Sequence, residues 1–161
     1  MLPLSPAHHP QFTLPSDRLP VQKAKAGEGE AAVQADKVAW ILIVEDDYLI
    51  AMQAESALTD AGFSIVGVAT TADEALALAR TQTPVLAVMD IRLAGKRDGV
   101  DAAGDLFREL GVRCVFATAH DDQHVRARAE PFAPLAWLTK PYSMASLVLA
   151  VREAISRRDL I

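Results

Sequence analysis

Short apolar runs alternate with segments of helical periodicity five times between residue 38 and the end of the chain. Each run has the length of a strand and is continuously apolar, which is typical of strands that are buried on both faces. The predicted strands are Ala39–Val44, Ser64–Ala69, Val85–Met89, Arg113–Thr118 and Leu135–Leu138. Strands that are joined by helices pair in parallel through right-handed crossovers. We therefore expect an α/β fold, a doubly wound five-stranded parallel sheet with five helices.

Capping signals and glycines set the bounds of the helices. Gly62 and Gly111 are placed to end two of them. The sequence TADE at residues 71–74 is a capping box, which should begin another. The expected helices run over residues 47–61, from Ala72 to before Pro84, from Val100 to Leu110, over residues 121–129, and from about Ser143 onward.

The first 37 residues differ in composition from the rest of the chain. Five of the nine prolines lie within the first twenty residues, and a polar run that contains glycine follows them. Prolines at this spacing exclude helix and favour an extended backbone. Acids and bases balance in residues 1–37, so the net charge of −5 lies on the remainder. We therefore divide the chain into an irregular N-terminal arm, residues 1–37, and one folded domain, residues 38–161.

The arm has too few large apolar side chains to fold alone. They are Leu2, Leu4, Phe12, Leu14, Leu19 and Val21. Because prolines reduce the entropy that an extended segment loses on docking, the arm could bind a neighbouring protomer and form an arm-exchanged homodimer. A simple tail and linker is the alternative.

Composition excludes several classes of function. The single cysteine, Cys114, rules out an internal disulfide framework and a cysteine-based zinc site. The net charge of −5 argues against sequence-independent binding to nucleic-acid phosphates. No signal peptide is visible, and no uncharged apolar stretch approaches the length of about 18 residues that a membrane span needs. We expect a cytoplasmic protein that binds neither nucleic acid nor membrane.

Polar side chains that can carry chemistry follow four of the predicted strands. They are Glu45, Asp46 and Asp47 after the first strand, Asp90 after the third, Thr118 at the end of the fourth and Lys140 after the fifth. Each acid alone has a structural explanation, because an acid between a strand and a helix is commonly a helix cap. In an open parallel sheet, however, the carboxyl ends of the strands meet at one edge. We expect these side chains to converge there.

Phosphoryl transfer is the chemistry that suits this set of side chains. Clustered carboxylates without cysteine or a well-placed histidine favour a hard cation such as Mg²⁺. A carboxylate beside that cation can act as a nucleophile toward phosphorus. The phosphoryl oxygens also need a fixed cation and a hydroxyl donor, which Lys140 and Thr118 would supply. Pro141 makes a cis peptide bond accessible directly after the lysine.

Four motifs make residues 38–158 resemble the receiver domain of bacterial two-component response regulators, which has a flavodoxin-like fold. They are ILIVEDD at residues 41–47, VMDIRL at 88–93, VFATA at 115–119 and LTKPY at 138–142. The resemblance implies that Glu45 and Asp46 form the acidic pair that binds Mg²⁺ with Asp90. It also implies that Asp90 is the phosphoacceptor, Thr118 the switch hydroxyl and Lys140 the lysine of the site. Asp47 then lies outside the pair and should cap the first helix.

The chain departs from the family pattern after the phosphoacceptor. Ala94 stands where the family usually has proline, and the next glycine comes one residue late, at Gly99. We therefore expect a longer, looser loop in which residues 95–97 are exposed. The aromatic switch position on the fifth strand is Trp137.

Two further residues are expected to modulate the site. Arg92, two residues after Asp90, stands where side chains of the family gate the attacking water. His120, two residues after Thr118, could flank the site as well.

The sequence therefore predicts a single-domain response regulator that takes a phosphoryl group from a sensor histidine kinase onto Asp90. The 161 residues are expected to leave no room for an output domain, so signalling would pass through a downstream protein or a phosphotransfer partner. We expect no enzymatic activity beyond self-phosphorylation from a donor and autodephosphorylation.

Three alternative functions are less favoured. An aspartyl-phosphate phosphohydrolase typically has a second catalytic aspartate two residues after the nucleophile, where this chain has Arg92. A phosphorylation-independent binding module would not require the complete set of acids, threonine and lysine. Flavin binding is disfavoured because no glycine-rich phosphate loop follows the first strand.

Overall fold

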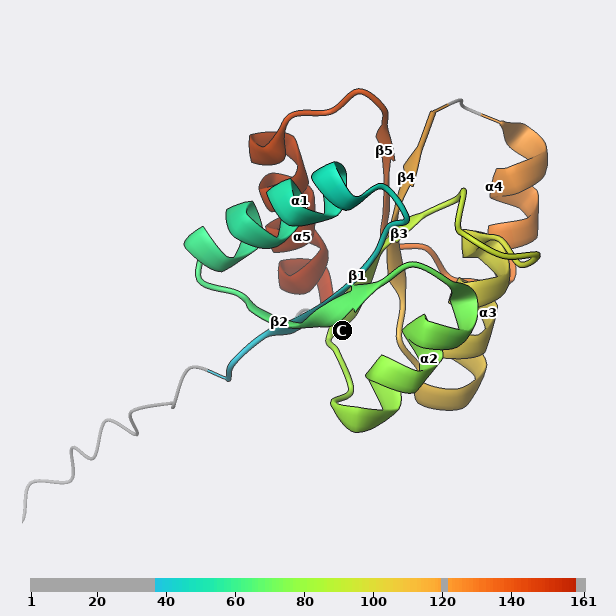
Figure 1. The fold of residues 1–161 in the computed structure, drawn as a ribbon, viewed down its shortest axis with the longest axis horizontal. Helices are drawn as coiled ribbons and strands as arrows, with labels where there is room; N and C mark the ends of the chain where they lie inside the picture. Colours follow the sequence, from blue (N-terminus) through green and yellow to red (C-terminus); the bar gives the residue numbers. More distant parts are fainter. Residues whose placement is uncertain (1–36, 120–121, 159–161) are drawn as a thin grey trace, which may run out of the picture. The chain divides into compact units, whose positions relative to one another are not determined.

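Five parallel strands form one sheet in the order β2-β1-β3-β4-β5 (Figure 1). The computed structural model describes residues 37–119 and 122–158. The strands are β1 Trp40–Val44, β2 Ser64–Ala69, β3 Leu86–Asp90, β4 Cys114–Thr118 and β5 Ala136–Thr139. The helices are α1 Tyr48–Asp60, α2 Ala72–Thr81, α3 Gly99–Leu110, α4 Gln123–Ala129 and α5 Met144–Arg158, with a 3-10 turn, η1, at Glu130–Phe132. The doubly wound α/β fold predicted from the sequence is confirmed.

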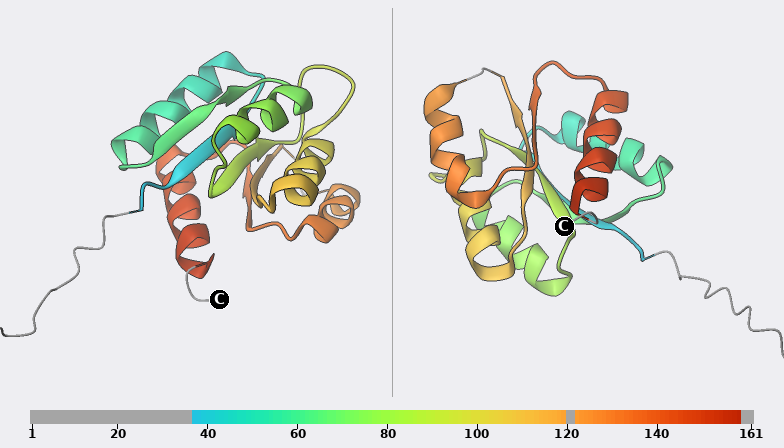
Figure 2. Two further views of the ribbon diagram at one scale, coloured as in Figure 1. Left: turned by 90° about the horizontal axis from the view of Figure 1, so that it is seen from below. Right: turned by 180° about the vertical axis from the view of Figure 1, so that it is seen from behind.

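Helices cover both faces of the sheet. Figures 1 and 2 show α1 and α5 on one face and α2, α3 and α4 on the other. Successive side chains of a strand point to opposite faces. Ile41 and Ile43 therefore pack in the core beneath α1 and α5, whereas Leu42 and Val44 pack beneath α2 and α3. All four side chains are buried, which explains why this strand reads as a continuous apolar run.

Most predicted caps are present. Asp47 caps α1 by accepting the N–H groups of Leu49 and Ile50, as expected. Gly62 follows α1 with φ +95°, and Gly111 closes α3 in the left-handed region with φ +66°. These two glycines occupy positions that residues with a side chain rarely adopt.

Two details at helix starts differ from the prediction. Thr71 caps α2 by accepting the Glu74 N–H, but the Glu74 carboxylate accepts from the N–H and hydroxyl of Thr70, both at 2.8 Å. In the predicted capping box the Glu74 carboxylate would accept from the N–H of Thr71. It accepts mainly from Thr70, the residue before the cap. Helix α4 begins at Gln123 rather than at residue 121, because Asp122 serves as its N-cap.

The expected bounds of the strands agree with the structure to within one residue. No helix among the described residues has the length and apolar character that a membrane crossing requires. The N-terminal arm lies outside the described residues except for Lys37. Its boundary with the domain, and its docking on a second protomer, stay predictions.

Gly99 is the first residue of α3 and lies against the backbone at the end of β3. Its N–H donates to the Ile91 carbonyl at 2.8 Å. A Cβ atom at this position would lie 1.9 Å from the Asp90 carbonyl oxygen, a contact that no small side-chain movement can relieve. The late glycine noticed in the sequence is therefore the residue that lets α3 approach β3.

We expect Gly99→Ala to lower the free energy of unfolding by about 3 kcal/mol, because α3 must shift away from the Asp90 backbone. Gly62→Ala is the matched control. Its Cβ would meet nothing within 4 Å, so only the strain of the positive φ remains, about 1 kcal/mol. Urea denaturation followed by circular dichroism measures both changes. Equal losses in the two variants would show that the close approach at Gly99 carries no cost.

Candidate functional site

Three carboxylates meet at the carboxyl edge of the sheet. Glu45 and Asp46 follow β1, and Asp90 ends β3, which pairs directly with β1. One oxygen from each of the three side chains lies within 4.8 Å of the others. Glu45 is 5% exposed and Asp90 6%, whereas Asp46 is open to solvent. Three oxygen donors this close together can hold a hard divalent cation.

Lys140 reaches the same point from the end of β5. Its Nζ lies 3.1 Å from Glu45 Oε2 and 3.2 Å from Asp90 Oδ1. The Lys140 N–H donates to the Thr118 carbonyl at 2.7 Å, and the peptide bond between Lys140 and Pro141 is cis. The side chains from β1, β3 and β5 thus converge as the sequence suggested.

The charges of the site do not balance. The pKa of Glu45 is raised, mainly by burial and further by the negative charge of Asp90. The Asp47 N–H and Lys140 act in the opposite direction but do not outweigh these effects. Burial would lower the pKa of Lys140, but the neighbouring Asp90 and Glu45 raise it. The ammonium is therefore firmly protonated, while the carboxylates repel one another. A divalent cation would relieve this excess of negative charge.

Thr118 lines a small cavity beside Asp90. Thr118 is the last residue of β4 and is 8% exposed. The cavity has a volume of about 190 Å³, and its walls are formed by Asp90, Ile91, Arg92, Thr118, Ala119, Asp122, Val125 and Lys140. The cavity therefore combines a carboxylate, a hydroxyl and an ammonium, which are the groups that phosphoryl transfer needs.

Trp137 lies on β5, two strands away from Asp90 on β3, and its ring is held on two sides. Its ring stacks on Phe116 with centroids 4.6 Å apart and planes at 17°. The guanidinium carbon of Arg126 lies 4.6 Å from the centre of the indole ring. Phe116 pairs with Trp137 in the β4–β5 register, two residues before Thr118. A movement of Thr118 would thus reach Trp137 through neighbouring residues of two paired strands.

The residues predicted as modulators have different outcomes. Arg92 is exposed and contributes to the cavity wall, so it is close enough to influence the site. His120 lies outside the described residues. Asp122 and Val125 also line the cavity, and the sequence reasoning missed both. The position of Asp122 between a strand and a helix at the same edge was the available signal.

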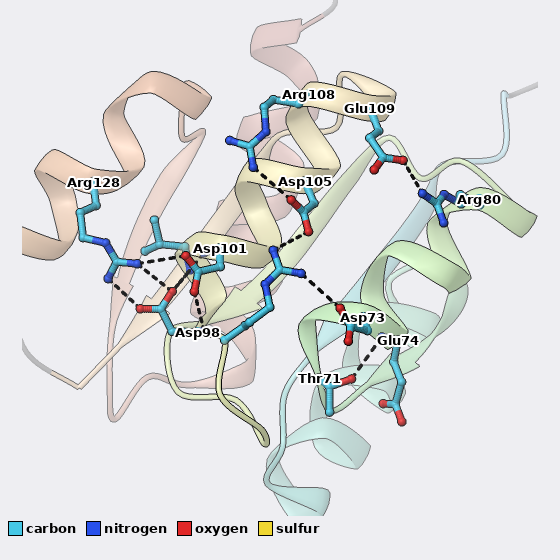
Figure 3. Close-up of polar contacts among 12 residues, drawn as sticks. Thr71, Asp73, Glu74, Arg80, Asp98, Asp101, Asp105, Arg108, Glu109 and Arg128 are labelled. Carbon is cyan, nitrogen blue, oxygen red and sulfur yellow. Dashed lines mark hydrogen bonds and ion pairs between the residues drawn. The ribbon is translucent and has the colours of Figure 1, made fainter.

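The expectation of a loose, exposed loop after Asp90 is wrong for Arg97. This side chain is half-buried and bridges two helices, with Nη1 3.1 Å from Asp73 of α2 and Nη2 2.6 Å from Asp105 of α3. Figure 3 labels these two acids. The Ala94 N–H also donates to the Thr70 carbonyl at 3.0 Å. The longer loop is thus held by ion pairs from Arg97 to acids on α2 and α3. The spacing of residues along the chain does not reveal these pairs.

A family model for the response regulator receiver domain matches residues 41–152. The transcriptional regulatory protein PdtaR of Mycobacterium tuberculosis is 36% identical over 117 residues, which cover 73% of this chain and 57% of that protein. The phyllosphere-induced regulator PhyR of Methylorubrum extorquens is 34% identical over 130 residues, covering 80% and 48%. This chain thus spans about half the length of these curated relatives.

Solved structures show the same similarity. The signal receiver domain of a modulated diguanylate cyclase from Desulfovibrio desulfuricans superposes with a TM-score of 0.70 at 31% identity, covering 76% of this chain and 98% of that one. The response regulator PhyR from Brucella abortus superposes with a TM-score of 0.65 at 27% identity, covering 76% and 50%.

We expect Glu45→Gln to raise the free energy of unfolding in EDTA at neutral pH by about 1 kcal/mol. The pKa of Glu45 is raised in the folded protein, so its ionisation costs stability as the pH rises above the unfolded value. The amide removes that cost and still offers an oxygen to the Asp47 N–H. Urea denaturation measures the change.

Glu74→Gln is the matched control for this prediction. The N–H of Thr70, followed by its hydroxyl, lowers the pKa of Glu74, so its ionised form is favoured in the folded protein. Neutralising Glu74 should bring no gain in stability. A loss of stability in Glu45→Gln would contradict the view that the ionised site is strained by repulsion.

Proposed function

Because the chain belongs to the response regulator receiver domain family, we propose that it accepts a phosphoryl group from a sensor histidine kinase onto Asp90. The observation that carries this proposal is the convergence of Glu45, Asp46, Asp90 and Lys140 beside the cavity that Thr118 lines. Glu45, Asp46 and Asp90 would hold Mg²⁺, whose preference for carboxylate oxygens fits a cluster without cysteine or histidine.

Each side chain has a defined task in the transfer. A carboxylate oxygen of Asp90 forms a bond to phosphorus while the bond to the donor's histidine nitrogen breaks, and that nitrogen keeps the electron pair. A Mg²⁺ ion held by Glu45, Asp46 and Asp90 would supply positive charge that neutralises the phosphoryl oxygens. The Lys140 ammonium, already 3.2 Å from Asp90 Oδ1, compensates the charge of another oxygen. The Thr118 hydroxyl donates to a further one.

Helix α1 offers a surface to a phosphodonor protein. Tyr48, Leu49 and Met52 are large apolar side chains that stay exposed, at 79%, 57% and 46%. They belong to the first turns of α1, directly after the acidic residues of the site. A protein that brings its phosphohistidine to Asp90 would cover these side chains, which supports protein partners for the site.

We also propose that the signal passes to a downstream protein or a phosphotransfer partner. A further part of the proposal is that the chain catalyses nothing beyond its own phosphorylation and dephosphorylation. Arg92 stands where a phosphohydrolase of the aspartyl-phosphate class would place its second aspartate. Arg92 places no carboxylate at the cavity wall that could take a proton from water, which favours a receiver over a hydrolase.

We expect acetyl phosphate and Mg²⁺ to add one phosphoryl group, a mass increase of about 80 Da, to the wild-type protein but not to Asp90→Asn. Excess EDTA should prevent the adduct, because the carboxylates alone repel the donor. Asp47→Asn is the matched control, since Asp47 caps α1 outside the cluster and asparagine also caps helices. Intact-mass spectrometry follows the adduct. Its persistence in Asp90→Asn would exclude Asp90 as the sole acceptor.

We also expect occupation of the site to change the emission of Trp137. A Thr118 hydroxyl drawn toward a phosphoryl oxygen leaves space behind it, into which the ring can move away from Phe116 and Arg126. Trp40→Phe removes the other tryptophan of the chain and isolates the signal. Fluorescence is recorded before and after adding beryllofluoride and Mg²⁺. The same additions to Asp90→Asn serve as the control, and an unchanged Trp137 spectrum would argue against the coupled movement.

A further inference from the structure

A bidentate ion pair ties α4 to the loop that follows Asp90. Arg128 Nη1 lies 2.7 Å from Asp98 Oδ2, and its Nη2 lies 3.1 Å from Asp98 Oδ1 and 3.4 Å from Asp101 Oδ1 (Figure 3). Asp98 is also the N-cap of α3 and accepts the N–H groups of Val100 and Asp101. The pair therefore joins the end of α4 to the point where the loop becomes α3.

The environment of the pair makes it stronger than a fully solvated one. The side chains of Arg128 and Asp98 are 36% and 33% exposed. Burial would raise the pKa of Asp98, but the bonds from Arg128 and from the backbone outweigh it, so the pKa is lowered. Asp98 is thus ionised at neutral pH, and two parallel charge-assisted bonds strengthen the pair, which stays accessible enough for salt to weaken it.

The other end of α4 faces the phosphoacceptor. Asp122 and Val125 line the cavity that contains Asp90, and the Asp122 carboxylate caps the helix by accepting the His124 N–H at 2.8 Å. A phosphoryl group on Asp90 brings up to about two negative charges into this cavity. The charge has the same sign as that of Asp122, so repulsion favours a position of α4 farther from Asp90.

Building on the phosphoacceptor function, we propose that the Arg128–Asp98 pair is a positioning contact that opposes phosphoryl loading of Asp90. The pair holds α4, and with it the Asp122 carboxylate, close to the cavity. Without the pair, the movement of α4 away from the cavity costs less free energy. Asp90 then accepts the negatively charged phosphoryl group more readily. Arg128 acts through α4, because its bonds go to Asp98 and Asp101 rather than to the reacting atoms.

We expect Arg128→Gln to lower the beryllofluoride concentration at half-saturation about threefold at a fixed Mg²⁺ concentration. Fluorine NMR of the bound species measures saturation directly and does not depend on Trp137. A wild-type protein that binds no beryllofluoride would contradict the phosphoacceptor function itself. If the wild type binds beryllofluoride but Arg128→Gln reaches half-saturation at an equal or higher concentration, the phosphoacceptor function stands. Only the proposed effect of the Arg128–Asp98 pair is then contradicted.

Asp98→Asn should lower the midpoint as Arg128→Gln does, because asparagine keeps the cap of α3 but loses the charge. The double variant should bring no further decrease, since both changes remove one contact. Arg157→Gln is the matched control, because it removes an exposed pair with Glu153 on α5 and should leave the midpoint unchanged. Arg128→Lys should restore part of the wild-type midpoint.

Salt separates the restraint from a structural defect. Added NaCl screens the pair in the wild type, so the midpoints of the wild type and Arg128→Gln should converge as the salt concentration rises. A variant that binds differently because α4 is damaged would keep its ratio to the wild type at every salt concentration. A constant ratio would therefore overturn the proposal.

Discussion

Two buried carboxylates at the ends of neighbouring parallel strands are the constraint on which the site depends. Glu45 and Asp90 are almost inaccessible to water, and β1 pairs with β3 in parallel, so the two acids must lie at the same edge. Their mutual repulsion is compensated only in part by Lys140, which arrives from β5. The sheet thus maintains a concentration of negative charge that is unfavourable for stability and suited to binding a cation.

The loop after Asp90 shows how the surrounding structure supports that edge. Gly99 allows α3 to approach the carbonyl of Asp90, and Arg97 fastens the same loop to α2 and α3. Arg128 adds a link from α4 to the cap of α3. Strand β3 is therefore connected to three helices on one face of the sheet through charged groups, which can respond to a change of charge at Asp90.

Much of the fold followed from local patterns. The apolar runs identified the strands to within one residue, and the glycines at 62 and 111 marked helix ends because positive φ angles favour residues without a side chain. The capping pattern at residues 71–74 was less reliable. Glu74 found a better partner in Thr70, and such choices between adjacent donors depend on backbone geometry rather than on residue type.

The sequence by itself determined the order of strands and helices, and with it the edge where Glu45, Asp46, Asp90, Thr118 and Lys140 gather. It could do so because side-chain periodicity and crossover handedness are local properties. Only the tertiary structure decided that Arg97 bridges Asp73 and Asp105, that Arg128 meets Asp98, and that Asp122 faces the cavity. These partners come from different elements, and long flexible side chains select them by proximity, which spacing along the chain does not encode.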